Sequence, residues 1–247
     1  MIKVLSLNTW NEEGPFRERW ELILDGIQRY CPDILAFQEL ISSEWAIKIA
    51  ARAGFNEVIG PEHGSGLVIM SPWPIANWES VVFKTKSKFE EYDRAVLFAC
   101  IHVGGVELSV LNTHLSWRLE DSVVRQHQVM GLISVANEMQ GRQPVLAMGD
   151  FNATPESPEI GKMAERGDFK DVYGYLYPGD LGYTWDNANP YTAAHGYPDR
   201  RLDYIFIRDS KGILGPVTSA EILFKEPNPD GVYASDHYGI LATFGGR

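Results

Sequence analysis

Short apolar segments that end in a polar side chain recur along this chain of 247 residues and constrain its fold. Residues 2–7 are apolar and β-branched and lead into Asn8, and residues 33–38 lead into Glu39 in the same way. Further strand-like segments end at Asn112 and His114, at Asp150 and Asn152, and next to Asp236 and His237. One polar residue after a strand is usually a turn former, but such a recurrence is hard to explain by turns alone. The pattern therefore predicts sheets whose strand ends share one polar site.

The hydrophobic periodicity alternates between strand and helix from one end of the chain to the other. Apolar residues at Trp20, Ile23, Leu24 and Ile27 follow helical spacing. We expect helices at residues 20–30, 44–52, 123–140 and 157–165, strands at residues 2–7, 33–38, 66–71, 95–103, 106–111, 144–148, 202–208 and 240–244, and a long loop region at residues 173–200. Strands mixed with helices throughout predict α/β layers with mixed or antiparallel sheets.

The length and charge narrow the class of protein. No linker or internal repeat divides the chain, so we expect a single domain over residues 1–247. A net charge of −11 without a run of Lys or Arg disfavours a protein that grips duplex nucleic acid mainly through its phosphates. Nucleic acid stays open as a partner, because a local basic patch can exist within a negative total.

The cysteines and the chain's apolar segments bear on its location. Cys31 and Cys100 lie in apolar surroundings, and we expect buried free thiols rather than a disulfide. The first ten residues form too short an apolar run for a signal peptide, and no stretch approaches the ~18 apolar residues of a membrane helix. We therefore expect a cytoplasmic protein. No basic amphipathic helix supports a membrane surface as a partner, and no pattern indicates an oligomeric state.

The polar residues at the strand ends are the types that bind hard cations. Asn, Asp and Glu offer oxygen ligands, which select Mg²⁺, Ca²⁺ or Mn²⁺ over softer metals. No Cys/His spacing indicates zinc. We predict Mg²⁺ as the cofactor, with Mn²⁺ as the alternative. Mg²⁺ commonly takes one or two carboxylates and receives substrate phosphate oxygens, so such a site can accept a phosphate ester.

Six motifs in a fixed order give the chain a family resemblance. They are LSLNTW around Asn8, DILAFQEL around Glu39, LNTHL around His114, MGDFNATP around Asp150, RRLDYIF around Asp203 and SDHYGI around His237. Each motif alone is weakly specific, but six in order over nearly the whole chain are highly specific. On these motifs the chain resembles the endonuclease/exonuclease/phosphatase superfamily, and within it the sphingomyelinase-like and uncharacterised bacterial-type hydrolase branches.

The resemblance implies a fold, an activity and a metal site. The fold is a four-layer α/β sandwich, in which two packed, mainly antiparallel sheets are flanked by helices. The activity is Mg²⁺-dependent hydrolysis of a phosphoester by a metal-assisted water, which makes the protein a phosphoric ester hydrolase. The resemblance implies that Glu39 binds the metal directly, that Asn8 lies beside it, and that Asp236 lies at the metal or next to it.

The resemblance also assigns catalytic roles. His237 is expected to contact the scissile phosphate or take the proton of the water, with Asp203 fixing its tautomer. Asp150 positions or activates the water, and Asn152 holds the phosphoryl oxygens. His114 contacts the phosphate or protonates the leaving oxygen. Which group acts as the general base differs between branches and stays open.

Four further residues are weaker candidates for contacts with the substrate: Asn112, Arg94, Arg201 and Trp185. An arginine can neutralise a phosphate, and a tryptophan can line a cleft. The structural alternatives are at least as good, since Asn112 can shape a strand end, arginines form structural ion pairs, and aromatic residues mostly lie in the core. Strand alternation places Arg201, Asp203 and Ile205 on one face.

Three functions compete. The acidic charge favours a phosphodiesterase or phosphatase that acts on a small or lipid-linked phosphate, and His114, where many apurinic endonucleases carry a tyrosine, supports this. An endo- or exonuclease on DNA or RNA is the alternative; it shares every catalytic residue but needs stacking aromatics and a local Lys/Arg groove. A non-catalytic binding module is disfavoured, because the set of catalytic residue types is intact.

Overall fold

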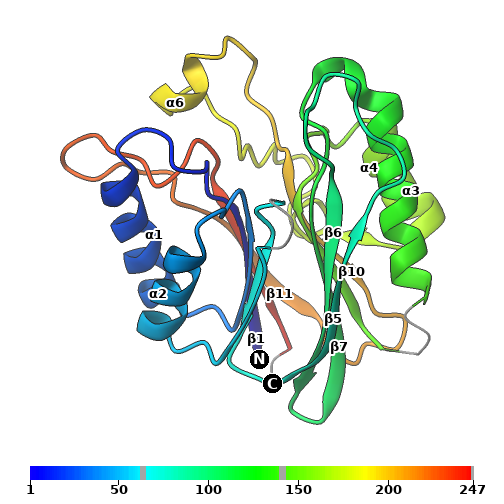
Figure 1. Ribbon diagram of the computed structural model, residues 1–247. Coiled ribbons are helices and arrows are strands. Elements are labelled where there is room, and N and C mark those ends of the chain that lie inside the picture. Colours follow the sequence, from blue (N-terminus) through cyan, green and yellow to red (C-terminus); the bar gives the residue numbers. More distant parts are fainter. Residues whose placement is uncertain (62–64, 139–142, 246–247) are drawn as a thin grey trace.

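The structure, a computed structural model, describes residues 1–61, 65–138 and 143–245, whose strands form two sheets of six (Figure 1). The first sheet has the order β11-β12-β1-β2-β4-β3, with β1 at Ile2–Asn8, β2 at Ile34–Gln38, β3 at Glu57–Ile59, β4 at Val68–Ser71, β11 at Val217–Leu223 and β12 at Gly239–Phe244. The second has the order β5-β6-β7-β8-β10-β9, with β5 at Ile75–Val82, β6 at Ala95–Val103, β7 at Val106–His114, β8 at Val145–Asp150, β9 at Lys170–Asp171 and β10 at Asp203–Arg208.

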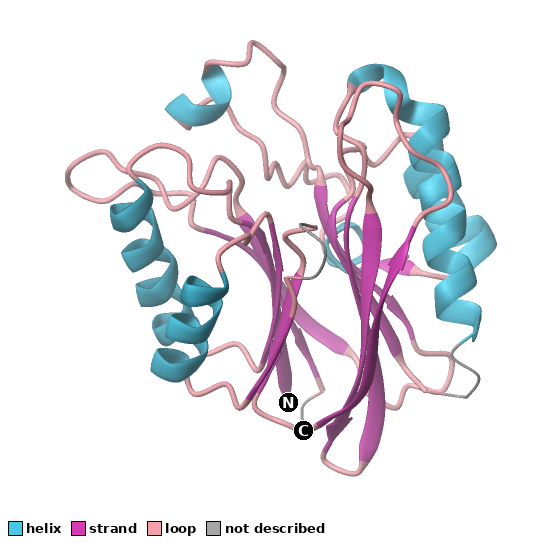
Figure 2. Cartoon of the chain, viewed as in Figure 1, coloured by secondary structure: helices cyan, strands magenta, loops and turns pink. Residues whose placement is uncertain are grey.

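Helices cover the outer face of each sheet, so the layers run helix, sheet, sheet, helix (Figure 2). The helices α1 (Phe16–Tyr30) and α2 (Ser43–Ala53) pack on the first sheet, and α3 (Ser122–Glu138) and α4 (Pro158–Gly167) pack on the second. Within each sheet one neighbouring pair is parallel and the other pairs are antiparallel. The predicted four-layer sandwich of two mainly antiparallel sheets is therefore confirmed.

Side-chain alternation along each strand determines which residues lie between the two sheets and which lie beneath the helices. It also determines the direction of the polar side chain at the end of the strand. On β1, Val4 packs in the core between the two sheets, whereas Leu5 packs beneath the helices of the first sheet. On β8, Met148 lies in the inter-sheet core and Ala147 lies beneath the helices of the second sheet. Because alternate residues share a face, the last residue of each of these strands also points between the sheets.

The two parallel pairs are the crossover units of the fold. The pair β1 and β2 is joined through α1, and the pair β7 and β8 is joined through the 3₁₀ turn Leu119–Asp121 and α3. Each pair occupies the middle of its sheet. Parallel strands end at the same edge, so four strand ends from two sheets meet at one end of the sandwich.

The sequence predicted the eight interior strands and missed the four at the sheet edges, namely β3, β5, β9 and β11. The interior strand β8 is buried throughout, but β5 is largely exposed along its length. An edge strand has one neighbour and keeps polar side chains in water, so it lacks the apolar run that marks a buried strand.

One helix boundary and one burial prediction need correction, and one predicted helix lies partly outside the described residues. The first helix begins at Phe16, four residues earlier than the apolar stripe indicated, because its first turn carries polar side chains. The last two residues of the predicted helix at residues 123–140 lie outside the described residues. Both cysteines are free, as expected, but Cys31 is exposed, because it caps the end of α1 with a left-handed backbone.

The predicted loop region at residues 173–200 contains the end of α5 (Val172–Leu176) and α6 (Pro190–Ala193). Its remaining residues connect β9 to β10, and Trp185 pairs with Arg200 through an isolated bridge. The segment around α6 rises beyond the strand ends, on the side where the parallel pairs finish (Figure 1). Among the described residues, no helix has the length and apolarity needed to cross a membrane.

Candidate active site

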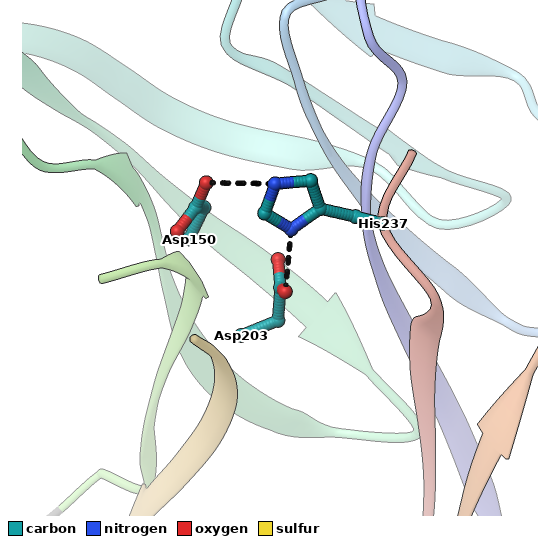
Figure 3. A group of neighbouring side chains, drawn as sticks. All are labelled: Asp150, Asp203 and His237. Atoms are coloured by element: carbon teal, nitrogen blue, oxygen red, sulfur yellow. Dashed lines mark hydrogen bonds and ion pairs between the residues drawn. The ribbon is translucent and has the colours of Figure 1, made fainter. Parts of the chain in front are cut away.

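The predicted site residues come together at the end of the sandwich where the two parallel pairs finish. Asn8 ends β1, Glu39 follows β2, His114 ends β7 and Asp150 ends β8. Asp203 opens β10 and pairs in register with Asp150, while Asp236 and His237 lie just before β12. Figure 3 shows Asp150, Asp203 and His237 pointing toward one another from three segments far apart in the sequence.

Two glycines make the close approach of these strands feasible. A β-carbon on Gly149 would lie 1.9 Å from the carbonyl oxygen of Thr113, so only glycine allows β8 to pass β7 immediately before Asp150. A β-carbon on Gly66 would lie 2.8 Å from the α-carbon of Glu39. Glu39 itself has a left-handed backbone with φ of 59°, which turns its side chain out of the β2 alternation.

A buried dyad orients His237. Its Nδ1 lies 2.8 Å from an oxygen of Asp203, and its Nε2 lies 3.7 Å from an oxygen of Asp150 (Figure 3). Burial alone would lower the pKa of His237, but Asp203, Asp150 and Asp236 outweigh burial and raise it well above its usual value. The ring is therefore held as an imidazolium between two carboxylates in the metal-free protein.

Asn8 joins the two sheets across the site. Its side-chain amide donates to Asp150 at 3.1 Å and to Glu39 at 3.3 Å. His114 lies between the same two carboxylates, with Nε2 3.4 Å from Asp150 and Nδ1 3.8 Å from Glu39. Burial, the Arg94 cation and His237 hold the pKa of His114 well below its usual value, so this ring is neutral at pH 7.

The carboxylates of the site fit a divalent cation. Burial raises the pKa of Asp150 and of Asp236 to about 6, and lack of solvation also raises the pKa of Glu39. Within the described part of the chain, no Lys or Arg nitrogen lies within 4.0 Å of these groups or of Asp203. Four carboxylates face one imidazolium, and a buried excess of negative charge is costly unless a cation compensates it. Oxygen donors of this kind suit Mg²⁺.

Two sets of side chains within the site could supply ligands to such a cation. Oxygen and nitrogen atoms of Asp150, Asp203 and His237 lie within 4.8 Å of one another. In this trio, however, His237 and one oxygen of Asp203 already bind each other at 2.8 Å. We therefore assign the dyad to proton chemistry and leave Glu39 as the carboxylate best placed for a metal, since 23 % of its side chain remains exposed.

Arg94 lines a pocket beside the metal-binding end of the site. The pocket has a volume of about 250 Å³, and Glu39, His114 and Tyr92 also line it. Glu90 holds the guanidinium of Arg94 through Nε at 2.8 Å and Nη2 at 3.3 Å. Arg94 thus lines the same pocket as Glu39 and His114.

Asn112 and Arg201 are held in structural contacts. Asn112 is fully buried, and its amide donates to the carbonyl oxygens of Phe37 and Val68 at 2.7 and 3.0 Å. This residue fastens the second sheet to the first instead of facing the substrate. Arg201 is 4 % exposed and pairs with Asp171 at 2.7 Å, which is a structural ion pair.

The two remaining candidates lie at the margin of the dyad. The ring of Trp185 is mostly buried and meets the ring of His237 edge-on at 5.0 Å, so it forms a wall behind the imidazole. Asn152 has a left-handed backbone, its N–H donates to Asp150 at 2.9 Å, and its side chain donates to the carbonyl of Leu115 at 3.2 Å.

Sequence reasoning missed three residues that shape the site. The amide of Asn11 contacts the carboxylate of Glu39. The hydroxyl of Ser235 donates to the carbonyl of Asn8 at 2.7 Å, and the hydroxyl of Thr184 accepts from the N–H groups of Leu202 and Asp203. Asn11 and Thr184 lie in loops without periodicity, so only the position of Ser235 inside the SDH motif could have signalled a role.

Two packed mixed sheets with acidic, amide and imidazole side chains at their joined strand ends define a metal-dependent phosphoesterase. The chain belongs to the Endonuclease/Exonuclease/phosphatase family, whose model matches residues 5–237. The predicted family, hydrolase class and Mg²⁺ or Mn²⁺ dependence are therefore confirmed.

Comparisons with known proteins agree with this family. Tyrosyl-DNA phosphodiesterase 2 of Bos taurus is 28 % identical over 255 residues, covering 97 % of this chain and 67 % of the relative. The chain thus spans about two thirds of that relative's length. The structure of D. rerio TDP2 complexed with single strand DNA product has a TM-score of 0.83 at 24 % identity, covering 99 % of both chains. A Staphylococcus aureus beta toxin has a TM-score of 0.80 at 21 % identity, covering 98 % of this chain and 99 % of the toxin.

Proposed function

We propose that this protein is a Mg²⁺-dependent phosphodiesterase that hydrolyses a phosphodiester at an end of single-stranded nucleic acid, with a tyrosyl group as one leaving group. The observation that carries the proposal is the buried set of Asp150, Asp203 and His237 next to Glu39. The sequence favoured a small or lipid-linked phosphate, and that preference stays a prediction. The tyrosyl-DNA phosphodiesterase relative, which aligns with 97 % of the chain, favours the nucleic-acid alternative.

The side chains divide the reaction between them. Asp150, with a pKa of about 6, is ionised at neutral pH and accepts the proton of the attacking water. The water oxygen forms the new bond to phosphorus, and the bond to the leaving oxygen breaks. His237, kept protonated by Asp203, donates Nε2–H to a phosphoryl oxygen. His114 is neutral and therefore suits contact with the phosphate better than protonation of the leaving oxygen.

The leaving group needs little assistance if it is a phenol. A tyrosyl oxygen departs as a phenoxide and then takes a proton from solvent. Glu39 and Asp236, with Asn8 beside them, would hold the Mg²⁺ ion. When bound, this ion neutralises charge on the phosphoryl and leaving oxygens.

The loops beside the pocket offer groups that suit a single strand. Tyr92 and Trp117 are 53 % and 40 % exposed, and the guanidinium of Arg118 lies 4.0 Å from the centre of the Trp117 ring. Lys84 and Lys88 are exposed on the neighbouring loop. Stacking aromatics beside cations are the features that a strand-binding surface needs.

The test uses matched substrates. We would compare a single-stranded oligonucleotide carrying a 5′-phosphotyrosyl group, the same oligonucleotide without tyrosine, bis-p-nitrophenyl phosphate, and sphingomyelin vesicles. Each is assayed with Mg²⁺, with EDTA, and with Asp150→Asn as the inactive control. Metal-dependent release of tyrosine, lost in the control, is the expected result. Hydrolysis of sphingomyelin with no cleavage of either oligonucleotide would overturn the proposal in favour of the lipid-linked substrate.

A further inference from the structure

Arg19, on the first turns of α1, is a buried cation with unusual partners. The residue is fully buried. Its Nε donates to the carbonyl oxygen of Glu13 at 2.9 Å, Nη1 to those of Thr9 and Ala234 at 2.9 and 3.0 Å, and Nη2 to those of Trp10 and Asn11 at 3.1 and 3.0 Å. A guanidinium has five N–H donors, so backbone carbonyls use all of them.

These carbonyls belong to two loops that carry predicted site residues. Four of them lie in the β1–α1 loop, directly after Asn8. The fifth, from Ala234, immediately precedes Ser235, Asp236 and His237. One side chain therefore joins the loop on the Glu39 side of the site to the loop that carries the dyad histidine.

The β1–α1 loop is strained where Arg19 holds it. Trp10 and Asn11 have positive φ angles of 56° and 43°, a backbone conformation that residues other than glycine rarely adopt. Both carbonyls bind the guanidinium, and the ring of Trp10 lies 4.8 Å from it. This backbone turn carries the amide of Asn11 to the carboxylate of Glu39.

Arg19 is also a buried cation close enough to the acidic cluster to act on its charge. Among the described residues, no carboxylate oxygen lies within 4.0 Å of its guanidinium. Its charge acts at longer range to lower the pKa of Asp236, against the larger effect of burial, which raises it. A buried cation without an ion pair is costly, which indicates that its contacts serve more than packing.

We propose that Arg19 is a positioning residue that sets the geometry of the metal-binding side of the site relative to His237. It touches neither the substrate nor the reacting atoms, and it acts through Asn11 on Glu39 and through Ala234 on Asp236 and His237. The role in catalysis rests on the proposed function, whereas the role in shaping the cation site stands on the contacts themselves.

The test compares Arg19→Lys with Arg208→Lys. Arg208 also donates to backbone carbonyls, those of Ala136 and Gly167 at 2.7 and 3.1 Å, but it lies at the end of β10 opposite Asp203. An ammonium has three donors and no fork, so both variants lose carbonyl contacts, and only one of them loses contacts at the site. Three quantities are measured: the melting temperature without metal, the Mg²⁺ concentration that gives half of the full thermal stabilisation, and kcat and KM for bis-p-nitrophenyl phosphate.

We expect Arg19→Lys to raise the half-stabilising Mg²⁺ concentration at least fivefold and to lower kcat at least tenfold with KM changed less than threefold. Arg208→Lys should leave the half-stabilising Mg²⁺ concentration, kcat and KM within twofold of the wild-type values, even where its melting temperature falls as far as that of Arg19→Lys. Equal effects of the two variants, or an unchanged Mg²⁺ response in Arg19→Lys, would overturn the proposal.

A substitute variant and a readout that is independent of activity keep the proposal testable. If Arg19→Lys does not fold, Trp10→Leu takes its place, since it removes the ring beside the guanidinium without removing a donor. It should raise the half-stabilising Mg²⁺ concentration two- to fivefold, and no change would overturn the proposal. If the wild type hydrolyses none of the substrates, the proposed function fails, but the Mg²⁺-dependent thermal shift still tests the role of Arg19.

Discussion

The side-chain amide of Asn8 on β1 lies 3.1 Å from the carboxylate of Asp150 on β8, so the two sheets are joined by a hydrogen bond inside the site. The two residues are 142 positions apart in the chain. Each ends a strand of one parallel pair and points between the sheets. The site thus exists only where the two crossover units face each other.

Asp203→Asn should lower kcat by about 10²- to 10⁴-fold with little change in KM, because His237 loses the charged partner that fixes its tautomer and supports the imidazolium. The measurement is steady-state hydrolysis of bis-p-nitrophenyl phosphate. Asp171→Asn is the matched control, since it removes an equivalent partner from Arg201 away from the dyad. Equal losses in both variants would show that a general structural effect, and not the dyad, is responsible.

Glu39→Gln should abolish the response to Mg²⁺ while leaving the metal-free fold intact. The substitution removes one carboxylate from an excess of buried negative charge, so the melting temperature in EDTA should stay the same or rise. Calorimetric titration with Mg²⁺ and thermal unfolding with and without the ion give the two readouts. Retained Mg²⁺ binding in this variant would contradict the assignment of Glu39 as a metal ligand.

The metal-free protein should lose stability as the pH rises from about 4 to about 6. Asp150 and Asp236 have pKa values near 6 in the folded state against an ordinary 3.8, so the folded state binds more protons and ionisation of these groups opposes folding. The raised pKa of His237 also lowers the free energy of unfolding as the pH rises above 6.5. The lowered pKa of His114 has the opposite effect, because it raises the free energy of unfolding as the pH rises towards 6.5.

The effect on stability should be on the order of 2–3 kcal/mol for each carboxyl group considered alone, and less than their sum for the pair. Chemical denaturation in EDTA across this pH range measures it. Mg²⁺ should restore more stability at pH 7.5 than at pH 5, and Asp150→Asn combined with Asp236→Asn should flatten the profile. A profile with the same slope in that double variant would exclude these two groups as its cause.

Replacing both Tyr92 and Trp117 with alanine should reduce kcat/KM for the tyrosyl oligonucleotide by about 30-fold or more, because base or ring stacking contributes about 1–3 kcal/mol per contact and two contacts are lost. Hydrolysis of bis-p-nitrophenyl phosphate should change less than threefold. Tyr175→Ala removes an equally exposed aromatic side chain from a pocket far from Glu39 and His114. Parallel losses on both substrates would place the two aromatic residues in the general fold and not in substrate binding.

Asn112→Ala should destabilise the protein by about 2–4 kcal/mol, since it removes a buried donor to the carbonyl groups of Phe37 and Val68. Equilibrium unfolding measures this loss. Activity per folded molecule should change far less than in Asp203→Asn. A loss of activity without a loss of stability would return Asn112 to the substrate-binding residues.

The sequence predicted the layers and most of the residues that meet at the site, because the signals for both lie within single strands. Interior strands such as β8 are apolar runs, and alternation along β10 predicted that Asp203 shares a face with Ile205, which lies in the core between the sheets. Edge strands such as β5 escaped prediction because one exposed edge and one exposed face leave no apolar run. Asn11 escaped because its role depends on a left-handed backbone and a distant arginine, and neither has a local signature.

The inter-sheet core has a consequence for rate as well as for stability. Its side chains include small ones, such as Ala36, Ala99 and Ala242, and they set how far apart the two sheets lie. Glu39 extends from one sheet and Asp150 from the other, so this spacing also sets the distance between the carboxylate proposed to hold the cation and the carboxylate proposed to accept the proton of the water. A methyl group added to this core, far from any substrate, would therefore move the two sheets apart and change the rate of hydrolysis at the site.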